Sequence, residues 1–446
     1  MQASEIAAVA EDLGIRLVRF LWCGNDGTVR GKATGLAGLE QRMRGGIGVT
    51  LAMEAMNSLD QLQPVASMGA VGELRIVPDP DTFRLLAYAP NAAAMLTDQI
   101  ALDGTPAEVC QRSFLKRMQG RLAQRGCTLH AGFENEFTLA VPDEGEWRPV
   151  DTSLCFSTIG LTVSQEYADA LVESLDRQGI AVDQYYAELG PGQQELTTGR
   201  AAAVRAADEQ ILVREAIRGV AATRGLAASL APKPWPDAAG NGGHIHFSVW
   251  DVDEERNRFY GPDGLSPEAA SFTAGVLEHL PALCGLTAPS FNSYRRITPH
   301  TWSGAYRCWG VDNREAPVRV PSVFRGVEEE STNVELKTAD ATCNPYLALG
   351  GLIAAGLDGL ERGLELPPPV DVDPGTLSED ERRSRGIAPM PATQAEALDA
   401  LEADAVLSEA LGPTLLRSYL AVRRSEWETY SAEDEEFERQ GHFLKY

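Results

Sequence analysis

The sequence predicts an α+β protein in two parts, a small sheet-rich domain over residues 1–104 and a larger domain of helices and strands over residues 105–446. Two observations predict this division. The first part consists of short apolar runs separated by Gly and Pro, whereas the second repeats a helix followed by glycine and then by a strand. Between them, Thr105 and Glu108 form a predicted capping box, and Pro106 suits the first position of a helix.

The small domain is expected to contain two pairs of strands. Ile15–Leu21 and Thr28–Gly35 lie on either side of an Asp-Gly turn, and Asp-Gly between two strands is a strong hairpin signal. Glu73–Pro78 and Thr82–Ala89 flank a second turn that contains two prolines. These stretches predict a small sheet.

Three helix–strand units follow in the larger domain. The first helix extends to about Arg125, the second begins near Gln165, and the third begins near Val204. Each ends at a glycine, which can adopt the left-handed conformation that terminates a helix. The stretches after these helices deliver acidic or imidazole groups, namely Glu134 and Glu136, then Glu188, then His244 and His246.

The C-terminal third is expected to be mainly helical. Asn344 can cap a long apolar helix that extends to about Leu360, and Pro345 suits its first turn. A Pro-rich connection covers Pro367–Pro391, and residues 395–427 show helical patterns. The acidic tail Ser431–Glu438 is expected to lie on the surface.

Charge and cysteine content narrow the function classes. The 446 residues carry 39 Lys and Arg against 64 Asp and Glu, a net charge of −25, and such an acidic chain repels nucleic-acid phosphates. The sequence has no run of about 18 apolar residues, so no membrane span is expected. The N-terminus lacks the features of a signal peptide, and the seven cysteines form no Cys-x-x-Cys pair. We therefore expect a cytoplasmic protein without a nucleic-acid or membrane partner.

The most informative stretch is Gly-Phe-Glu-Asn-Glu-Phe at residues 132–137. Because side chains alternate along a strand, Phe133 and Phe137 face a core, while Glu134 and Glu136 share the opposite face. Two adjacent carboxylates repel each other unless a cation lies between them or one is protonated. On its own, the stretch is also consistent with an edge strand whose polar face lies in water.

Two other stretches offer groups of the same kind. Glu188 and Glu195 flank a Gly-Pro-Gly bend that can turn both carboxylates toward one point, although such bends also occur in solvated loops. A glycine-rich loop leads into a strand on which His244, His246 and Ser248 share one face. This spacing suits a metal or phosphate site, or a polar face that is internally hydrogen-bonded.

Arginines and a further alternating strand complete the set. Arginine grips carboxylates and phosphates through a bidentate fork, whereas a solvated surface is the alternative role. The arginines are Arg295, Arg296, Arg314 and Arg319. A strand at residues 333–337 places Asn333, Glu335 and Lys337 on one face.

Together these residues predict phosphoryl transfer assisted by a divalent cation. Five glutamates and one histidine on separate elements form an oxygen-rich ligand set, which suits Mg²⁺ or Mn²⁺ better than Zn²⁺ or copper. Arginines and divalent cations neutralise the charge of a transferring phosphoryl group. The sequence has no Gly-x-x-x-x-Gly-Lys-Ser/Thr loop, which excludes a P-loop enzyme.

The order of these motifs resembles the glutamine synthetase superfamily over nearly the whole chain. The motifs are Val29-Arg30-Gly31-Lys32, the Glu-x-Glu strand, Glu188 and Glu195, Lys233-Pro234, His244-Ile245-His246, Asn292-Ser293-Tyr294-Arg295-Arg296, Asn313-Arg314, Arg319, Glu335 and Asn344-Pro345-Tyr346. The resemblance implies a small N-terminal β-grasp domain and a large catalytic domain with a mainly antiparallel curved sheet flanked by helices. It also implies rings of six subunits, usually stacked in pairs, with each site between neighbouring subunits.

The resemblance implies that ATP phosphorylates the side-chain carboxylate of glutamate and that an amine displaces the phosphate. Two divalent cations, Mg²⁺ or Mn²⁺, would take part. By position, the ligands of one are Glu136, Glu188 and Glu195, and those of the second are Glu134, His244 and Glu335.

The same comparison implies the substrate-binding residues. Arg296 would bind the α-carboxylate of glutamate, and Arg314 and Arg319 would bind the transferring phosphate, so these three arginines are the predicted catalytic residues. The substrate site would comprise Gly240, Arg296, Trp302 and Lys337. The ATP site would comprise His246, Ser248, Arg314 and Arg319.

Several positions depart from the pattern of glutamine synthetases. Gly24 and Trp302 replace an aspartate and a glutamate that favour the small ammonium ion. Lys337 and Asn333 replace arginines, and Lys337 keeps the charge but loses the fork. Ala239 replaces an asparagine that helps to hold glutamate, and the tyrosine loop used for adenylylation is absent from the Pro-rich connection.

These departures resemble the branch that makes γ-glutamyl amides from polyamines or monoamines. Trp302 can stack on a cationic amine or pack against an apolar one, and a buried aromatic that closes the site is the alternative. We therefore expect an ATP-dependent ligase that joins glutamate to an organic amine. The alternatives are an ordinary glutamine synthetase that uses ammonia, a ligase that uses another acid, and a non-catalytic assembly with the same fold.

Overall fold

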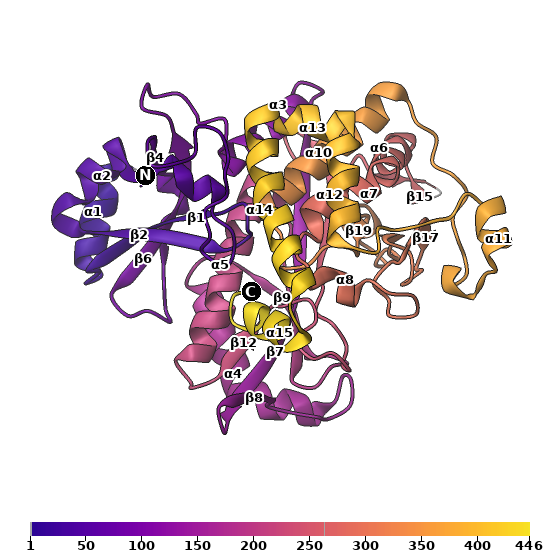
Figure 1. Ribbon diagram of the computed structural model, residues 1–446, viewed down its shortest axis with the longest axis horizontal. Coiled ribbons are helices and arrows are strands. Elements are labelled where there is room, and N and C mark those ends of the chain that lie inside the picture. Colours follow the sequence, from indigo (N-terminus) through magenta and orange to yellow (C-terminus); the bar gives the residue numbers. More distant parts are fainter. Residues whose placement is uncertain (1, 263) are drawn as a thin grey trace.

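The computed structural model describes residues 2–262 and 264–446 and has an α+β architecture in two parts. The N-terminal domain lies at one end of the molecule in Figure 1. Its mixed sheet has the order β2-β1-β6-β4-β3, with β5 paired to β6. The elements are α1 (Ala3–Asp12), β1 (Leu17–Cys23), β2 (Val29–Gly35), α2 (Leu39–Gly45), β3 (Ile47–Thr50), β4 (Glu73–Pro78), β5 (Arg84–Leu85) and β6 (Ala92–Ile100).

The predicted first hairpin is confirmed, and the predicted second strand pair is wrong. β1 and β2 pair antiparallel across the Asp-Gly turn. β4 pairs with β3 and β6, while residues 82–89 contribute only the two-residue strand β5. The Pro-rich turn after β4 begins a short 3-10 helix at Pro80–Thr82, so the chain leaves the sheet there. The partner of β1 in the sheet centre is the Ala-rich β6, a parallel neighbour.

The larger domain is built on a ten-stranded sheet in which every pair except β17–β18 is antiparallel. The long strand β7 lies at its centre and pairs with β8, β10, β11, β12 and β13. The strands are β7 (Cys127–Asp143), β8 (Glu146–Pro149), β9 (Val182–Ala187), β10 (Gln193–Thr198), β11 (Ala201–Ala202), β12 (Ala227–Ser229), β13 (Gly243–Asp251), β17 (Trp309–Val311), β18 (Val318–Val320) and β19 (Val334–Leu336).

Two short hairpins lie outside this sheet, and helices cover it. The hairpins are β14 (Tyr260–Gly261) with β15 (Gly264–Leu265), and β16 (Tyr306–Arg307) with β20 (Ala388–Pro389). The helices are α3 (Gln111–Ala123), α4 (Thr158–Asp176), α5 (Ala203–Ala222), α6 (Pro267–Glu278), α7 (Leu280–Thr287), α8 (Ser293–Arg296), α9 (Glu328–Ser331), α10 (Pro345–Arg362), α11 (Glu379–Ser384), α12 (Gln394–Ala403), α13 (Ala405–Leu411), α14 (Pro413–Ala432) and α15 (Glu435–Phe443).

Helix α10 is the central helix of this layer and contacts α3, α5, α6, α7 and α13. Its predicted cap is confirmed, because the Asn344 side chain accepts hydrogen bonds from the backbone N–H groups of Tyr346 and Leu347. Two other predicted helix starts are wrong, and the Pro-rich connection contains a short helix. Thr105 caps no helix, since α3 starts after Cys110. Helix α4 starts seven residues before Gln165, and residues 379–384 of the Pro-rich connection form α11.

The expected surface position of the acidic tail is confirmed for residues 431–437, which are exposed. Its last residues begin α15, in which Glu438 is buried and pairs with Arg295 at 3.0 Å. In Figure 1, α15 lies beside the long helix α14 and close to the C-terminus. No helix in residues 2–262 and 264–446 has the length and apolar character that a membrane crossing requires.

Strand β1 belongs to two cores, because its side chains alternate between its faces. Phe20 and Trp22 pack into the N-terminal core, whereas Leu21 and Cys23 join the large core of the second domain. The β1–β2 turn therefore inserts into the second domain. The Asn344 side chain donates to the carbonyls of Cys23 and Gly24 at 3.0 and 3.1 Å.

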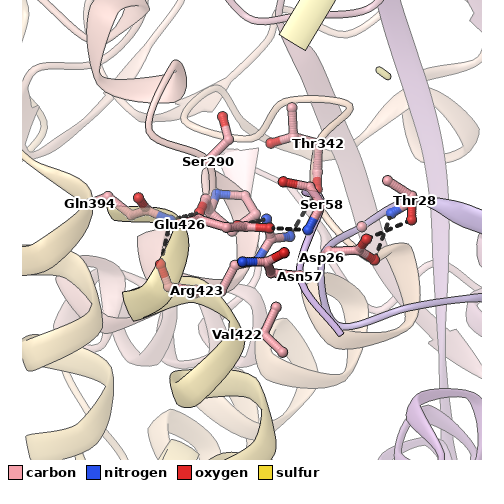
Figure 2. Close-up of polar contacts among 12 residues, drawn as sticks. Asp26, Thr28, Asn57, Ser58, Ser290, Thr342, Gln394, Val422, Arg423 and Glu426 are labelled. Atoms are coloured by element: carbon pink, nitrogen blue, oxygen red, sulfur yellow. Dashed lines mark hydrogen bonds and ion pairs between the residues drawn. The ribbon is translucent and has the colours of Figure 1, made fainter. Parts of the chain in front are cut away.

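Buried polar contacts complete this domain interface (Figure 2). The Ser58 N–H donates to Glu426 at 2.9 Å, and Glu426 pairs with Arg423 at 3.0 Å. Arg423, which is fully buried, also donates to the Thr342 carbonyl at 3.2 Å. An unpaired buried charge is costly, so these matched contacts fix the two domains in one arrangement.

Candidate active site

Strand pairing brings the predicted site residues onto one face of the large sheet. Directly opposed residues of an antiparallel pair point to the same side. The opposed pairs are Glu195 with Glu136, His244 with Glu134, His246 with Glu335, and Arg319 with Glu335. The prediction that Phe133 and Phe137 face the core is confirmed, since both are buried in the main hydrophobic cluster.

Glu335 lies at the centre of this group and is fully buried. Its carboxylate oxygens lie 2.6 Å from Arg319, 3.2 Å from Lys337 and 3.3 Å from His244. Burial alone would raise the pKa of Glu335, but Lys337 and the histidines lower it to about 2. The Glu335 side chain is therefore ionised at neutral pH and joins the acidic and basic parts of the site.

The two histidines approach the carboxylates from β13. His244 Nδ1 lies 2.8 Å from Glu134 Oε1, and His246 Nε2 lies 3.2 Å from Glu134 Oε2. His246 Nδ1 also contacts the Asn333 side-chain oxygen at 2.9 Å. Burial opposes the charged imidazole, but Glu134 and Glu335 raise the pKa of His246 to about 9. His246 thus lies within the cluster itself, in contact with both Glu134 and Glu335.

The acidic side of the cluster contains Glu136, Glu188 and Glu195. Burial, together with Glu134 and Glu136, raises the pKa of Glu195 to about 10. Burial and Glu136 also raise the pKa of Glu188. The Tyr186 hydroxyl donates a hydrogen bond to Glu195. These shifts follow from carboxylates gathered with too few positive charges nearby.

This donor set fits divalent cations. Carboxylate or imidazole atoms lie within 4.8 Å of one another in two groups, Glu134–His246–Glu335 and Glu134–Glu136–His244. Oxygen-rich sets of this kind suit Mg²⁺ or Mn²⁺. Neither group includes Glu188 or Glu195, and His246 takes the place that the family resemblance gives to His244 in one group. A cation would relieve the repulsion that raises the pKa of Glu195.

The basic side of the site fits anionic groups. Arg296 and Arg319 each have a buried Nε atom without a hydrogen-bond partner among the described residues. Arg296 donates through Nη2 to the carbonyls of Lys337 and Ala339 at 3.3 and 3.0 Å. A side chain at Gly240 would lie 2.7 Å from Arg296 Cγ, so glycine allows the loop to pack on this arginine. Gly240, Arg296 and Lys337 are thus brought together.

Three predicted residues lie apart from these contacts. Arg314 is exposed in the turn between β17 and β18. The Ser248 hydroxyl is buried and accepts a hydrogen bond from the Trp250 indole at 2.8 Å. The Trp302 side chain is 55% exposed, which excludes the alternative that it is a buried core aromatic in the single chain. Its backbone N–H donates to Glu315 at 2.8 Å.

Packing within the β1–β2 turn accounts for the glycine at position 24 of this chain. Gly24 lies in the turn that docks on Asn344 at the domain interface. A side chain there would meet the Asp26 carboxylate at 2.5 Å. An acidic residue at position 24 would therefore disturb this turn, so the glycine is explained by packing.

Sequence reasoning missed two residues that organise the cluster. The Gln193 amide donates to Glu136 at 3.1 Å and to the Gly240 carbonyl at 2.8 Å, which links the acidic side to the loop that contains Gly240. Tyr186 contacts Glu195 from the neighbouring strand. Gln193 lies in the stretch between Glu188 and Glu195, directly after the Gly-Pro-Gly bend. This position was the signal in the sequence that could have indicated its contact with the carboxylates.

Comparison with known families identifies both parts of the chain. The description "Glutamine synthetase N-terminal domain" matches residues 1–107, and "Glutamine synthetase, catalytic domain" matches residues 108–442. Among solved structures, the chain is similar to one titled "Crystal structure of novel glutamine synthase homolog", with a TM-score of 0.85 and 34% identity over 96% of this chain and 97% of that chain. It is also similar to a "GmaS/ADP complex", with a TM-score of 0.84 and 27% identity over 97% and 98% of the two chains.

Curated relatives include proteins with two different activities in their names. The gamma-glutamylpolyamine synthetase GlnA3 of Streptomyces coelicolor is 35% identical over 95% of this chain and 92% of its own length. The glutamine synthetase of Methanocaldococcus jannaschii is 34% identical over 80% of each chain. That of Mycolicibacterium smegmatis is 31% identical over 96% of each chain. Identity alone therefore does not select the nitrogen substrate.

Proposed function

Because the chain belongs to the glutamine synthetase family, we propose that it joins the γ-carboxylate of glutamate to an organic amine at the expense of ATP, with Mg²⁺ or Mn²⁺. The observation that carries this proposal is the charge arrangement of the cluster. Buried carboxylates and two histidines lie on one side, and Arg296, Arg319 and Lys337 lie on the other. A ligase that activates a carboxylate with ATP needs both halves.

The basic half is assigned to the anionic substrates. Arg296 and the Gly240 loop would bind the α-carboxylate of glutamate, with Lys337 beside them. Arg319, and Arg314 once it turns inward, would bind the phosphate in transfer, and His246 and Ser248 would lie beside the nucleotide. The free Nε atoms of Arg296 and Arg319 support these roles, since a buried N–H without a partner is costly.

The acidic half is assigned to divalent cations. Glu134, Glu136, Glu188, Glu195, His244 and Glu335 are the proposed ligands, and His246 joins them through its contacts with Glu134 and Glu335. A cation bound there supplies neutralisation of the phosphate charges. The pKa of about 10 for Glu195 supports the assignment, because without a cation the carboxylates have too few positive charges nearby to balance their negative charge.

The reaction would proceed in two steps. An oxygen of the glutamate γ-carboxylate attacks the γ-phosphorus of ATP, the bond to the β-phosphate oxygen breaks, and ADP leaves. The amine nitrogen then attacks the carbonyl carbon of the acyl phosphate, the C–O bond to phosphate breaks, and the nitrogen releases a proton as phosphate leaves. The protein side chains position these groups and exclude water, which would otherwise hydrolyse the acyl phosphate.

An organic amine is favoured over ammonia by Trp302 and by the relative that is named a polyamine synthetase. The Trp302 side chain is 55% exposed, so its ring is accessible to a ligand or to a neighbouring subunit. We also propose that the chain assembles into rings in which neighbouring subunits complete each site. Trp302→Glu is expected to weaken organic-amine use, and an unchanged amine profile would remove Trp302 from the amine site.

An ordinary glutamine synthetase is the second candidate, supported by the relatives with that name at 31–34% identity. Phosphate release from ATP with glutamate and Mg²⁺ separates the two when ammonia, ethanolamine, putrescine, spermine and short alkylamines are compared. Faster turnover with an organic amine supports the proposal. Turnover with ammonia alone supports glutamine synthesis, and no release with any nitrogen source supports another acid or a non-catalytic assembly.

A further inference from the structure

The acidic side of the site carries negative charge that lysine or arginine does not balance. In the described part of the chain, neither Glu188 nor Glu195 has a lysine or arginine within ion-pair distance, and Glu136 lies directly opposite Glu195 on the paired strand. Even with one divalent cation bound, the ionised carboxylates of Glu136, Glu188 and Glu195 together retain a net negative charge. This side of the cluster therefore attracts an ammonium group.

A short segment, Leu154–Phe156, lies beside Glu188 and the end of β9. Cys155 Sγ is 3.8 Å from Glu188 Oε2, and the Phe156 N–H donates to the Ala187 carbonyl at 3.0 Å. The Phe156 ring meets the Tyr186 ring edge-on, with centroids 5.3 Å apart and planes at 79°. Tyr186 in turn donates to Glu195. The segment thus contacts the cluster directly through Cys155 and indirectly through Phe156 and Tyr186.

The segment displays apolar side chains instead of burying them. Leu154 is 83% exposed, Phe156 is 65% exposed, and Leu189, next to Glu188, is 55% exposed. Phe156 also has a φ of +57°, a conformation that is strained for a bulky residue. The adjacent Ser157 caps α4 through the Ile159 N–H, so the start of the helix holds Phe156 in this outward position. Exposed apolar groups gathered beside a polar site indicate a binding surface.

We infer that Leu154, Phe156, Tyr186 and Leu189 bind the carbon body of the amine substrate, with its nitrogen toward Glu188 and Glu195. This inference rests on the proposed function and narrows it to primary monoamines with an alkyl or aryl body. A polyamine fits less well, because its next ammonium group would be desolvated against leucine and phenylalanine side chains. The wall of the amine site is therefore this segment, in addition to Trp302.

Alkylamines of increasing length, from methylamine to hexylamine, test the inference in the full chain with ATP, glutamate and Mg²⁺. We expect kcat/KM to rise about fourfold for each methylene that contacts the segment, which corresponds to about 0.8 kcal/mol. Spermine should be used less well than butylamine. A flat profile, or better use of spermine, would overturn the inference while leaving glutamate–amine ligation intact.

The variant Phe156→Gly removes the ring and relieves the backbone strain, so the fold is preserved. It should flatten the chain-length profile and lower kcat/KM for butylamine at least about tenfold. The KM values for ATP and glutamate and the methylamine rate should stay within about twofold. Val163→Ala, which trims another exposed apolar side chain on α4, is the matched control and should keep the profile.

A second variant tests the opposite direction. Leu154→Glu adds a carboxylate at a highly exposed position and should shift preference from butylamine toward putrescine, by about tenfold in the ratio of kcat/KM. If both variants keep the wild-type profile, the inference is wrong. If they keep it and the oligomer mass falls in light scattering, the segment is instead a contact between copies of the chain. Wild-type turnover with ammonia alone would refute the proposed function and this inference together.

Discussion

Cation binding to the acidic side of the site is expected to release a proton from Glu195. In the cation-free protein, burial and the neighbouring Glu134 and Glu136 hold the pKa of Glu195 near 10, so this carboxyl is protonated at neutral pH. A divalent cation binds the ionised form. Affinity should therefore rise about tenfold for each pH unit between about pH 6.5 and 9, and level off as the pH approaches 10.

Calorimetric titration of Mn²⁺ at pH 7.5, in buffers with different ionisation enthalpies, measures the number of protons released. Glu195→Gln should release about one proton fewer than the wild type and lose about one unit of slope in log affinity against pH. Glu315→Gln is the matched control, because Glu315 is another buried carboxyl with a raised pKa outside the cluster. Equal proton release by wild type and Glu195→Gln would refute this account of the acidic side.

Two further predictions concern stability. Gly27→Ala should destabilise the fold by at least about 3 kcal/mol in denaturant unfolding, since φ is +74° and the new Cβ would lie 1.9 Å from a carbonyl of the second domain. The control Gly14→Ala has a φ of +66° but 3.8 Å to its nearest atom, so it should lose only about 1 kcal/mol of stability. Equal losses by the two variants would contradict the docking of the turn on the second domain. His279→Gln removes contacts of 3.0 and 2.6 Å to Asp358 and Asp404 that raise the pKa of His279 against the effect of burial. Its cost should be about 3 kcal/mol below pH 6 and should shrink as the pH rises through that raised pKa, whereas a cost independent of pH would contradict a charged His279.

Local periodicity predicted the faces of the site strands but not the identity of their neighbours. Alternation along a strand is enough to place Glu134 and Glu136 on one face of their strand, and His244 and His246 on one face of theirs. The register that opposes His246 to Glu335 depends on which strands pair, which is a long-range property. Tyr186 was missed for this reason, because its contact with Glu195 exists only when β9 and β10 are side by side.

Helix signals were reliable where packing agreed with them. Asn344 caps α10 as expected, since the buried cap also bonds the β1–β2 turn. Thr105 carries an equally good local signal, but its N–H and hydroxyl bond to Asp103 in a turn, and the helix starts only after Cys110. The acidic tail lies on the surface as predicted over residues 431–437, but the burial of Glu438 could not be predicted, because its pairing with Arg295 joins positions far apart in the sequence.

The most direct test of the central claim is a competition between nitrogen sources. The protein is incubated with ATP, Mg²⁺, glutamate labelled with ¹⁸O in the γ-carboxylate, and equal concentrations of ammonia and butylamine, and the products are analysed by mass spectrometry. The account predicts mainly γ-glutamylbutylamide, with one ¹⁸O transferred to the released phosphate. Glutamine as the main product, or phosphate without label, would contradict it.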